Sequence, residues 1–252
     1  MKKVKDAILS VLAPMVVLVV LFGFWQYMCV ANNIPKWLLP SPLNIFSCMI
    51  ENFGEFWPHF LITLKTVLIG FLFAVPVGIL IATLITSSRV ASAALSPYIT
   101  ILVITPLIVL LPILMLFLGY GIKVRIIGVV IQAFAIVNMN SCTGMLNVPV
   151  IRHELMQTVG ASKLQSLRHV IYPTAAMDIF TGVRLSAIFS TTACISAEYV
   201  GGNEGLGALI IRYSQYLKTT ESFACIFYVM IIGLLMYGMV SFLQNKVIYW
   251  KS

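Results

Sequence analysis

Six long runs of apolar residues dominate this sequence and restrict what it can fold into. They lie near residues 9–31, 60–86, 97–118, 125–146, 177–198 and 222–244. A hydrocarbon core about 30 Å thick is crossed by roughly 20 helical residues. Backbone groups that face lipid must find their hydrogen-bond partners within the protein, and a helix provides them. We therefore predict an all-α, polytopic membrane protein with six transmembrane helices.

The low content of charged residues supports a membrane location. Hydrophobic residues make up 60% of the 252 residues and charged residues only 10%, whereas soluble domains carry about 25% charged residues. The formal net charge of +8 would suggest nucleic acid as a partner of a soluble protein. Here the basic residues stand between apolar runs, where they suit anionic lipid headgroups. We expect contact with membrane lipid and no nucleic-acid partner.

The first apolar run predicts a retained helix, and the basic residues predict its orientation. Lys2, Lys3 and Lys5 precede a stretch from Ile8 to Ala31, which is longer than the roughly 7–15 residues of a signal-peptide core. Six spans place both termini on one side of the membrane. With that side cytoplasmic, the inner loops and flanks hold more Lys and Arg than the outer ones. We predict a multi-pass protein of the inner (plasma) membrane with both termini cytoplasmic.

The sequence predicts three parts: residues 1–58, a core domain of residues 59–246 that holds the other spans, and a cytoplasmic tail of residues 247–252. The first part contains a short segment in which Ser41 can cap a helix and Pro42 suits its first turn. Apolar residues recur at helical spacing along it, namely Phe46, Met49, Ile50 and Phe53. The pattern predicts an amphipathic helix that lies along the outer interface or packs on the bundle, and favours neither.

The longest polar stretch on the predicted cytoplasmic side, from Asn147 to Tyr172, lies between the fourth and fifth spans. Gly160 is predicted to end a first short helix there, because glycine readily adopts positive φ where a chain must turn. Ser162 and Gln165 then fit a capping box, in which the Ser hydroxyl accepts from the backbone and the Gln side chain reaches back. We expect two short helices that form an elbow.

The second helix of the elbow is predicted to carry an apolar stripe of Leu164, Leu167 and Ile171, and to end at Pro173. Such an elbow, fixed between two membrane spans, offers a cytoplasmic protein a compact projection to bind. The alternative is a structural loop that has no partner.

Residues in and around the elbow resemble a known family. Those of the elbow are similar to the EAA loop of ABC-importer permeases, namely Glu154, Gly160-Ala161-Ser162 and Val170-Ile171-Tyr172-Pro173. Further matches lie outside it, in Leu39-Pro40-Ser41-Pro42, Pro106, Pro112, Phe117, Gly119, Gly121, Thr181-Gly182-Val183-Arg184, Ala197-Glu198 and Gly205-Leu206-Gly207. Together they resemble the nitrate/sulfonate/taurine/bicarbonate branch of binding-protein-dependent permeases, over residues 38–246. The chain departs from the pattern at Leu155 and Met156, which replace two alanines, and at Met177, which replaces a proline.

The resemblance implies a type I ABC-importer permease that works with several partners. These are a second permease copy, as in a homodimer, two cytoplasmic ABC ATPase subunits and an external solute-binding protein. The cargo would be a small anion such as a sulfonate, nitrate or bicarbonate, or a small heterocycle, moved by alternating access. The sequence contains no G-x-x-x-x-G-K-[ST] motif, so ATP and Mg are expected in the partner ATPase. We expect no cofactor in this chain and no enzymatic activity of its own.

The resemblance also assigns the ATPase-coupling role to residues 147–173. Glu154, Gly160, Ala161 and Ser162 are predicted to shape the coupling turn. The apolar contact with the ATPase would come from Leu164 and Leu167, ahead of Pro173.

Two charged residues of the fifth span are candidates for the translocation path or its gate. Arg184 and Glu198 stand in an apolar run, where a charge at the helix centre costs roughly 2.5–3.5 kcal/mol and less near an end. Gly205 and Gly207, from the Gly-rich segment that follows, join them as candidates. A local hydrogen bond or ion pair is the alternative role for both charged residues.

Other functional classes find little support in the residues. His153 and Glu154 begin an H-E-x-x-H pattern, but Gln157 occupies the place of the second ligand, so no metal site is predicted. The histidines and carboxylates form no catalytic set. The main alternative is an ion-coupled secondary transporter, which needs titratable residues within the membrane and commonly contains inverted repeats.

Overall fold

The computed structural model describes residues 2–248, with side chains from residue 12 onward, so residues 249–252 of the predicted tail lie outside it. All regular secondary structure in the described residues is helical, which confirms the predicted all-α class. The chain forms two compact units. One contains residues 1–58 and 209–227, and the other contains residues 59–208 and the chain from residue 228 onward. The three-part division remains a prediction.

The first unit contains two complete helices, α1 (Lys2–Ala31) and α2 (Pro42–Glu51). The hydroxyl of Ser41 accepts a hydrogen bond from the N–H of Asn44, so Ser41 caps α2 as predicted. The buried side of α2 carries Ile45 and Cys48, whereas Ile50 is 77% exposed. The predicted apolar stripe therefore does not form the buried face of α2 within this unit.

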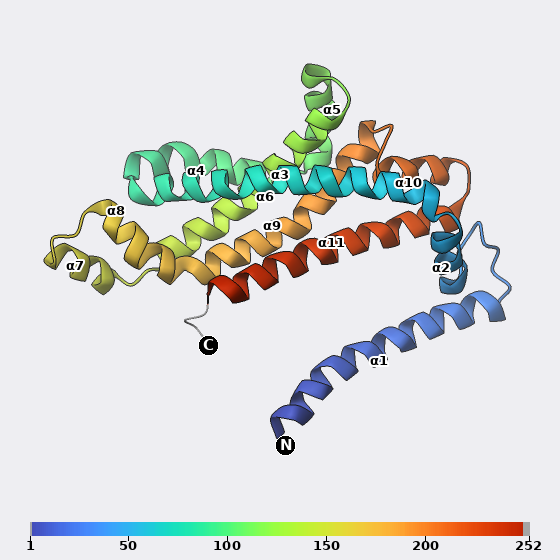
Figure 1. Ribbon diagram of the computed structural model, residues 1–252. Helices are drawn as coiled ribbons and strands as arrows, with labels where there is room; N and C mark the ends of the chain where they lie inside the picture. The colour runs from blue at the N-terminus through green and yellow to red at the C-terminus, as the bar shows by residue number, and fades with distance from the viewer. Residues whose placement is uncertain (1, 249–252) are drawn as a thin grey trace. The chain divides into compact units, whose positions relative to one another are not determined.

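The second unit is built on long helices that lie side by side (Figure 1). Its main helices are α3 (Phe53–Ser87, from His59 onward), α6 (Ile122–Leu146), α9 (Tyr172–Gly201) and α11 (Thr219–Val247, from Tyr228 onward). Glycines allow α3 and α6 to approach closely, because a Cβ atom on Gly70 would lie 2.5 Å from Val129 and one on Gly78 would lie 2.9 Å from Val137. Small residues permit such close contact between membrane helices, where packing rather than the hydrophobic effect drives association.

The third predicted span is broken in the structure. Residues 97–118 were expected to form one helix, but the chain forms α4 (Arg89–Ile104) and α5 (Leu107–Leu118), which are bent by 104° at the break. Thr105 has φ −71° and ψ 120°, which is extended backbone. A residue before proline is pushed out of the helical region by the proline ring, so Pro106 accounts for the break after Ile104.

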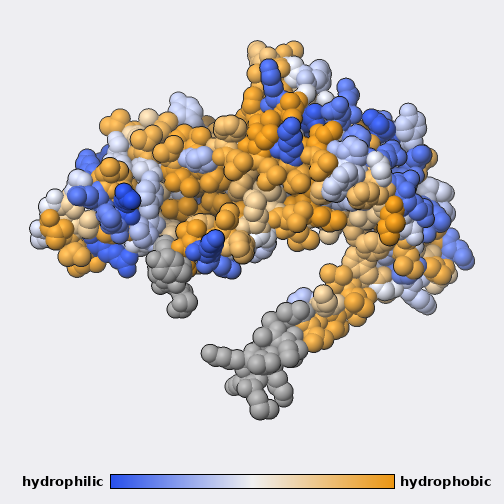
Figure 2. Space-filling model, in the orientation of Figure 1, coloured by the Kyte–Doolittle hydropathy of each residue, from blue (hydrophilic) through white to orange (hydrophobic). Residues whose placement is uncertain are grey.

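Five helical segments in the described residues are long and apolar enough to cross a membrane, or up to six if the bent α4–α5 pair is one span. Within the second unit, the visible surface over α3, α4 and α11 is mostly apolar, while polar residues gather around α7 (Val150–Thr158) and α8 (Lys163–Ser166) (Figure 2). This distribution agrees with membrane-embedded helices that carry a water-exposed elbow.

Candidate functional site

The elbow begins with α7 and turns at a glycine. Gly160 has φ +67°, a conformation that favours glycine, and its N–H donates to the carbonyl of Gln157 at 3.0 Å. The Ser162 hydroxyl then accepts from the N–H of Gln165 at 3.3 Å, and the Gln165 side chain accepts from the N–H of Ser162 at 2.7 Å. The predicted glycine break and capping box are both confirmed.

The predicted end of the second elbow helix at Pro173 is wrong. α8 passes into η1, a π-helical turn at Leu167–Ile171, and η1 passes into α9 without a gap, so that Lys163–Gly201 is one helical segment of 39 residues. In η1 the N–H of Tyr172 donates to the carbonyl of Leu167, five residues earlier. A π-turn is a local adjustment that lets a helix continue through proline. The second arm of the elbow is therefore the beginning of α9 itself.

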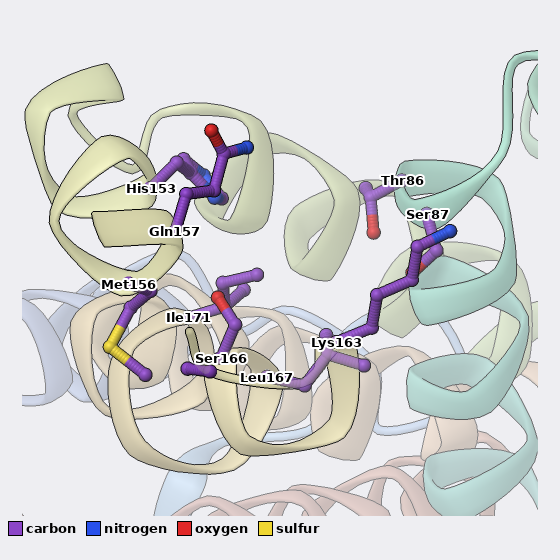
Figure 3. Close-up of a pocket in the computed structure, with 10 residues that line it drawn as sticks. Thr86, Ser87, His153, Met156, Gln157, Lys163, Ser166, Leu167 and Ile171 are labelled. Carbon is purple, nitrogen blue, oxygen red and sulfur yellow. The ribbon is translucent and has the colours of Figure 1, made fainter. Parts of the chain in front are cut away.

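The elbow encloses a hollow of about 250 Å³ against the end of α3. Figure 3 shows Thr86 and Ser87 of α3 on one side, His153, Met156 and Gln157 of α7 on another, and Ser166 and Leu167 along the second arm. The Tyr172 and Thr83 hydroxyls form a hydrogen bond at 2.9 Å, which joins the start of α9 to α3. The second arm is thus attached to α3, whereas the first arm is attached to α9, where Arg152 donates to the Thr174 hydroxyl, and faces α3 across the hollow.

The outer surface of the elbow carries exposed apolar side chains. Ile151, Leu155 and Val159 recur every four residues along α7 and its end, and are 71%, 62% and 68% exposed. Leu164, on the second arm, is 74% exposed, whereas Leu167 lines the hollow. The sequence interpretation selected Leu164 and Leu167 and missed the stripe on α7, although the spacing of four residues was the signal that could have revealed it. Glu154 lies exposed on the same helix.

A second cluster surrounds Glu198, at the opposite end of α9. The Glu198 side chain is fully buried, and its carboxylate accepts hydrogen bonds from the Thr63 hydroxyl at 2.9 Å and from the N–H of Gly207 at 2.9 Å. The Thr63 hydroxyl in turn accepts from the N–H of Leu206 at 2.9 Å. We call these residues, with Arg125, Gly205 and Glu204, the Glu198 network. It fastens the segment after α9 to α3.

Two glycines make room for the carboxylate in the Glu198 network. A Cβ atom on Gly205 would lie 2.2 Å from Cδ of Glu198, and Gly205 has φ +100°. A Cβ atom on Gly207 would lie 2.8 Å from Cβ of Glu198. Both positions therefore exclude larger residues on steric grounds, which explains why glycine and glutamate occur together in this part of the sequence.

Arg125 belongs to the Glu198 network, although sequence reasoning did not select it. It is 6% exposed, its guanidinium lies 3.8 Å from the Glu198 carboxylate, and it donates to the backbone carbonyl of Glu204 at 3.1 Å. A buried charge normally requires such a partner. The signal in the sequence was an arginine within an apolar run, the same signal that identified Arg184 and Glu198.

We expect Thr63→Val to lower the free energy of unfolding by about 1–3 kcal/mol, because the N–H of Leu206 would lose its acceptor in a buried place. Thr66→Val is a matched control, since Thr66 is equally buried on α3 but donates only to its own helix, at the carbonyl of Ile62. Thermal unfolding of the purified protein in detergent measures both variants. Equal shifts in the two variants would contradict the proposed bridging role of Thr63.

The structure does not bring Arg184 into this network. Its guanidinium lies over the ring of Tyr237, 5.6 Å from the ring centroid. Glu198 is fourteen positions after Arg184 in the sequence, which is about 21 Å along α9. The hydrogen bonds and ion pair that were the alternative to a path or gate are seen at Glu198, whereas Arg184 contacts an aromatic ring. The described residues also contain no group of His, Cys, Asp and Glu side chains that could hold a metal.

Comparisons with known proteins agree with this architecture. Residues 74–249 match the family described as "Binding-protein-dependent transport system inner membrane component". The chain is 27% identical to the formylaminopyrimidine transport permease protein ThiX of Halalkalibacterium halodurans, with 96% of each chain covered. It is 26% identical to the taurine transport system permease protein TauC of Escherichia coli, with 93% of this chain and 88% of that one covered.

A solved structure shows the same fold. A chain of the crystal structure of an amino acid ABC transporter with histidines superposes with a TM-score of 0.64, at 20% identity, over 80% of this chain and 98% of that one. With helices that can cross a membrane, a glycine-hinged elbow and a family match over most of its length, this chain belongs to the binding-protein-dependent transport system inner membrane components, the permease subunits of ABC importers.

Proposed function

We propose that the elbow is the surface through which an ATPase subunit drives this permease. The observation that carries the proposal is the exposed apolar stripe of Ile151, Leu155 and Val159 on an otherwise polar projection. Exposed apolar patches of this kind mark sites of protein association. The partner ATPase binds ATP and Mg, while the permease chain itself supplies no nucleotide site.

The elbow residues have distinct parts in this proposal. Gly160, Ala161 and Ser162 form the turn that sets the angle between the two arms, and Ser162 fixes the start of the second arm. Leu164 extends the apolar surface beside the α7 stripe, and Glu154 provides a charge at its edge. Leu167 and Pro173 lie where the second arm passes into α9, so force applied to the elbow reaches α9 directly.

The proposed assembly contains two permease copies, two ATPase subunits and an external solute-binding protein, with the elbow and both termini on the cytoplasmic side of the inner membrane. Movement of the ATPases would tilt the α9 helices as rigid bodies and so alternate access to the two sides. The Glu198 network, with Gly205 and Gly207, lies at the far end of α9 and would hold the outer segment to α3 during that movement. Arg184 remains a candidate for the path between them.

The cargo in this proposal is a small solute, either an anion such as a sulfonate, nitrate or bicarbonate, or a small heterocycle. The names of the relatives span both chemistries, since one is a formylaminopyrimidine permease and another a taurine permease. An ion-coupled mechanism would instead need a membrane carboxylate that is free to exchange a proton. Glu198 is held by Thr63, by a backbone N–H and by Arg125, which favours the ATP-driven mechanism.

We expect Leu155→Glu to reduce co-purification of the ATPase and solute uptake at least tenfold, because it places a charge within the apolar stripe. Leu155 is 62% exposed, so the variant should insert and fold normally. Gln157→Glu is the matched control, since it adds the same charge to α7 on the side that faces the hollow. Affinity purification through a tagged permease and quantification of the bound ATPase measure both. Normal association of the Leu155→Glu variant would refute the proposed surface.

A further inference from the structure

A cavity of about 400 Å³ lies between α4 and α6, near the ends of α3 and α6 at which the elbow begins, since Ile85 and Leu146 line it. Small-molecule sites occupy about 300–1,000 Å³. The cavity exists because α4 touches α6 loosely: none of the side chains of α4 is buried, although the helix runs beside α6. A helix that is held next to a neighbour without burying any residue leaves room for a further molecule.

One wall of the cavity is polar. Ser92, Ser96 and Thr100 recur every four residues along α4 and face the space, and Asn138 and Cys142 recur at the same spacing along α6. Residues four apart lie on one face of a helix. Two polar stripes that line one cavity offer hydrogen-bonding groups to a bound molecule.

The polar stripes retain hydrogen-bonding capacity. The Ser92 and Ser96 hydroxyls line the cavity and are partly exposed, so each can donate and accept. The Thr100 hydroxyl donates to the carbonyl of Ser96 at 3.0 Å, which leaves its oxygen as an acceptor. The cavity therefore presents both donors and acceptors, as a ring that carries adjacent N–H and C=O groups requires.

The lining of the cavity carries no charge. Each of the described residues that surround it is a Ser, Thr, Asn, Cys, Met, Val, Ile or Leu. An anion moved from water into such a site would lose its hydration without gaining a cation, which is strongly unfavourable. The two arginines of the spans are engaged elsewhere, Arg125 with Glu198 and Arg184 with Tyr237.

We infer that this cavity is a transit site for an uncharged heterocyclic solute with a polar edge, and that the permease conducts such solutes in preference to small anions. The inference rests on the proposed function and narrows its cargo. Apolar side chains such as Met139 and Val103 would cover the faces of the ring, while the stripes of α4 and α6 would bind its edge.

The cavity contains a natural reporter for this inference. Four of the five cysteines are buried, and the fifth, Cys142, is partly accessible and lines the cavity. The experiment is to treat the purified permease, in complex with its ATPase, with N-ethylmaleimide and to follow alkylation of Cys142 by mass spectrometry. Uracil and nicotinamide serve as neutral probes, and nitrate and ethanesulfonate as anionic ones.

We expect at least one neutral probe to slow alkylation of Cys142 fivefold or more, and both anions to leave it unchanged. Protection by an anion that equals protection by the neutral probes would overturn the inference, as would the absence of protection by either neutral probe. The inference would also be overturned if Cys142 reacted only after lipid was removed, because lipid would then fill the cavity. The same holds if Cys142 never reacted in the complex, because a second permease copy would then fill it.

Thr100→Val tests the polar wall. We expect this substitution to weaken the protection of Cys142 by the neutral probe about fivefold, which corresponds to the loss of one hydrogen bond. Thr105→Val is the matched control, because Thr105 also lies at the α4 helix and its hydroxyl also donates to a carbonyl four residues back, but it does not line the cavity. Equal effects of the two variants would contradict the proposed role of the polar wall in binding the solute. The amount of ATPase that stays bound to the permease is measured in the same sample. If the ATPase stays bound but no neutral probe protects Cys142, the solute site is refuted while the proposed coupling through the elbow still stands.

Discussion

Gly205→Ala should strongly destabilise the folded permease. The added Cβ would lie 2.2 Å from both Cδ and Oε1 of Glu198, closer than atoms can approach, and the alanine would also have to adopt φ +100°. Because the Glu198 carboxylate is fixed by Thr63 and Gly207, it cannot retreat without giving up these hydrogen bonds. Overpacking and backbone strain together cost about 3–5 kcal/mol, a large share of the roughly 5–15 kcal/mol that stabilises a protein.

The measurement for Gly205→Ala is thermal unfolding of the detergent-solubilised protein, followed by size-exclusion chromatography. A loss of this size corresponds to a fall in melting temperature of about 10 °C. Gly233→Ala is the control, because a Cβ atom there would meet no atom within 4 Å. A Gly205→Ala protein that melts with the wild type would show that the Glu198 network does not hold the segment after α9.

Gly160→Pro should reduce solute uptake at least a hundredfold while leaving the amount of permease in the membrane unchanged. Proline fixes φ near −65°, whereas Gly160 has φ +67°, and proline also removes the N–H that donates to Gln157. The two arms would then meet at a different angle, and the stripe of Ile151 and Leu155 would no longer face the ATPase together with Leu164. The core helices do not depend on this turn, so insertion should persist.

Gly160→Asn separates the shape of the elbow turn from the identity of its residue. Asparagine tolerates positive φ better than other residues, and no atom lies within 4 Å of the position that its Cβ would occupy. We expect this variant to retain most of the uptake and of the ATPase binding. If Gly160→Pro transports normally, or if both variants lose activity equally with an intact fold, the elbow angle is not what couples the two proteins.

Prolines show why the sequence predicts helices better than their breaks. Pro14, Pro97 and Pro112 lie inside helices, and α9 continues through Pro173, whereas Pro106 follows a sharp bend. Neighbouring helices and local adjustments can satisfy the carbonyl groups that a proline frees within a membrane. Whether such support is present depends on tertiary packing, which the residues around each proline do not reveal. Helix existence was therefore predictable here, and the bend between α4 and α5 was not.

In the candidate sites, too, features that depend on residues close together in the sequence were predictable, and features that depend on residues far apart in the sequence were not. The elbow turn depends on Gly160, Ser162 and Gln165, which are neighbours in the sequence, and its capping box was predicted correctly. The partners of Glu198 are not neighbours: Thr63 lies 135 residues away. The sequence identified the glutamate and the two glycines as unusual, but only the three-dimensional structure shows that they share one space.

The uninterrupted passage from the elbow into α9 gives the permease a lever. Thirty-nine residues from Lys163 to Gly201 extend over about 58 Å. A rotation of about 5° at the elbow would then displace the far end by about 5 Å, roughly the spacing of one helical turn. Within Lys163–Gly201 the regular α-helix is interrupted at the π-turn of η1, so the stiffness of that turn would determine how much of a small cytoplasmic motion arrives at the other side.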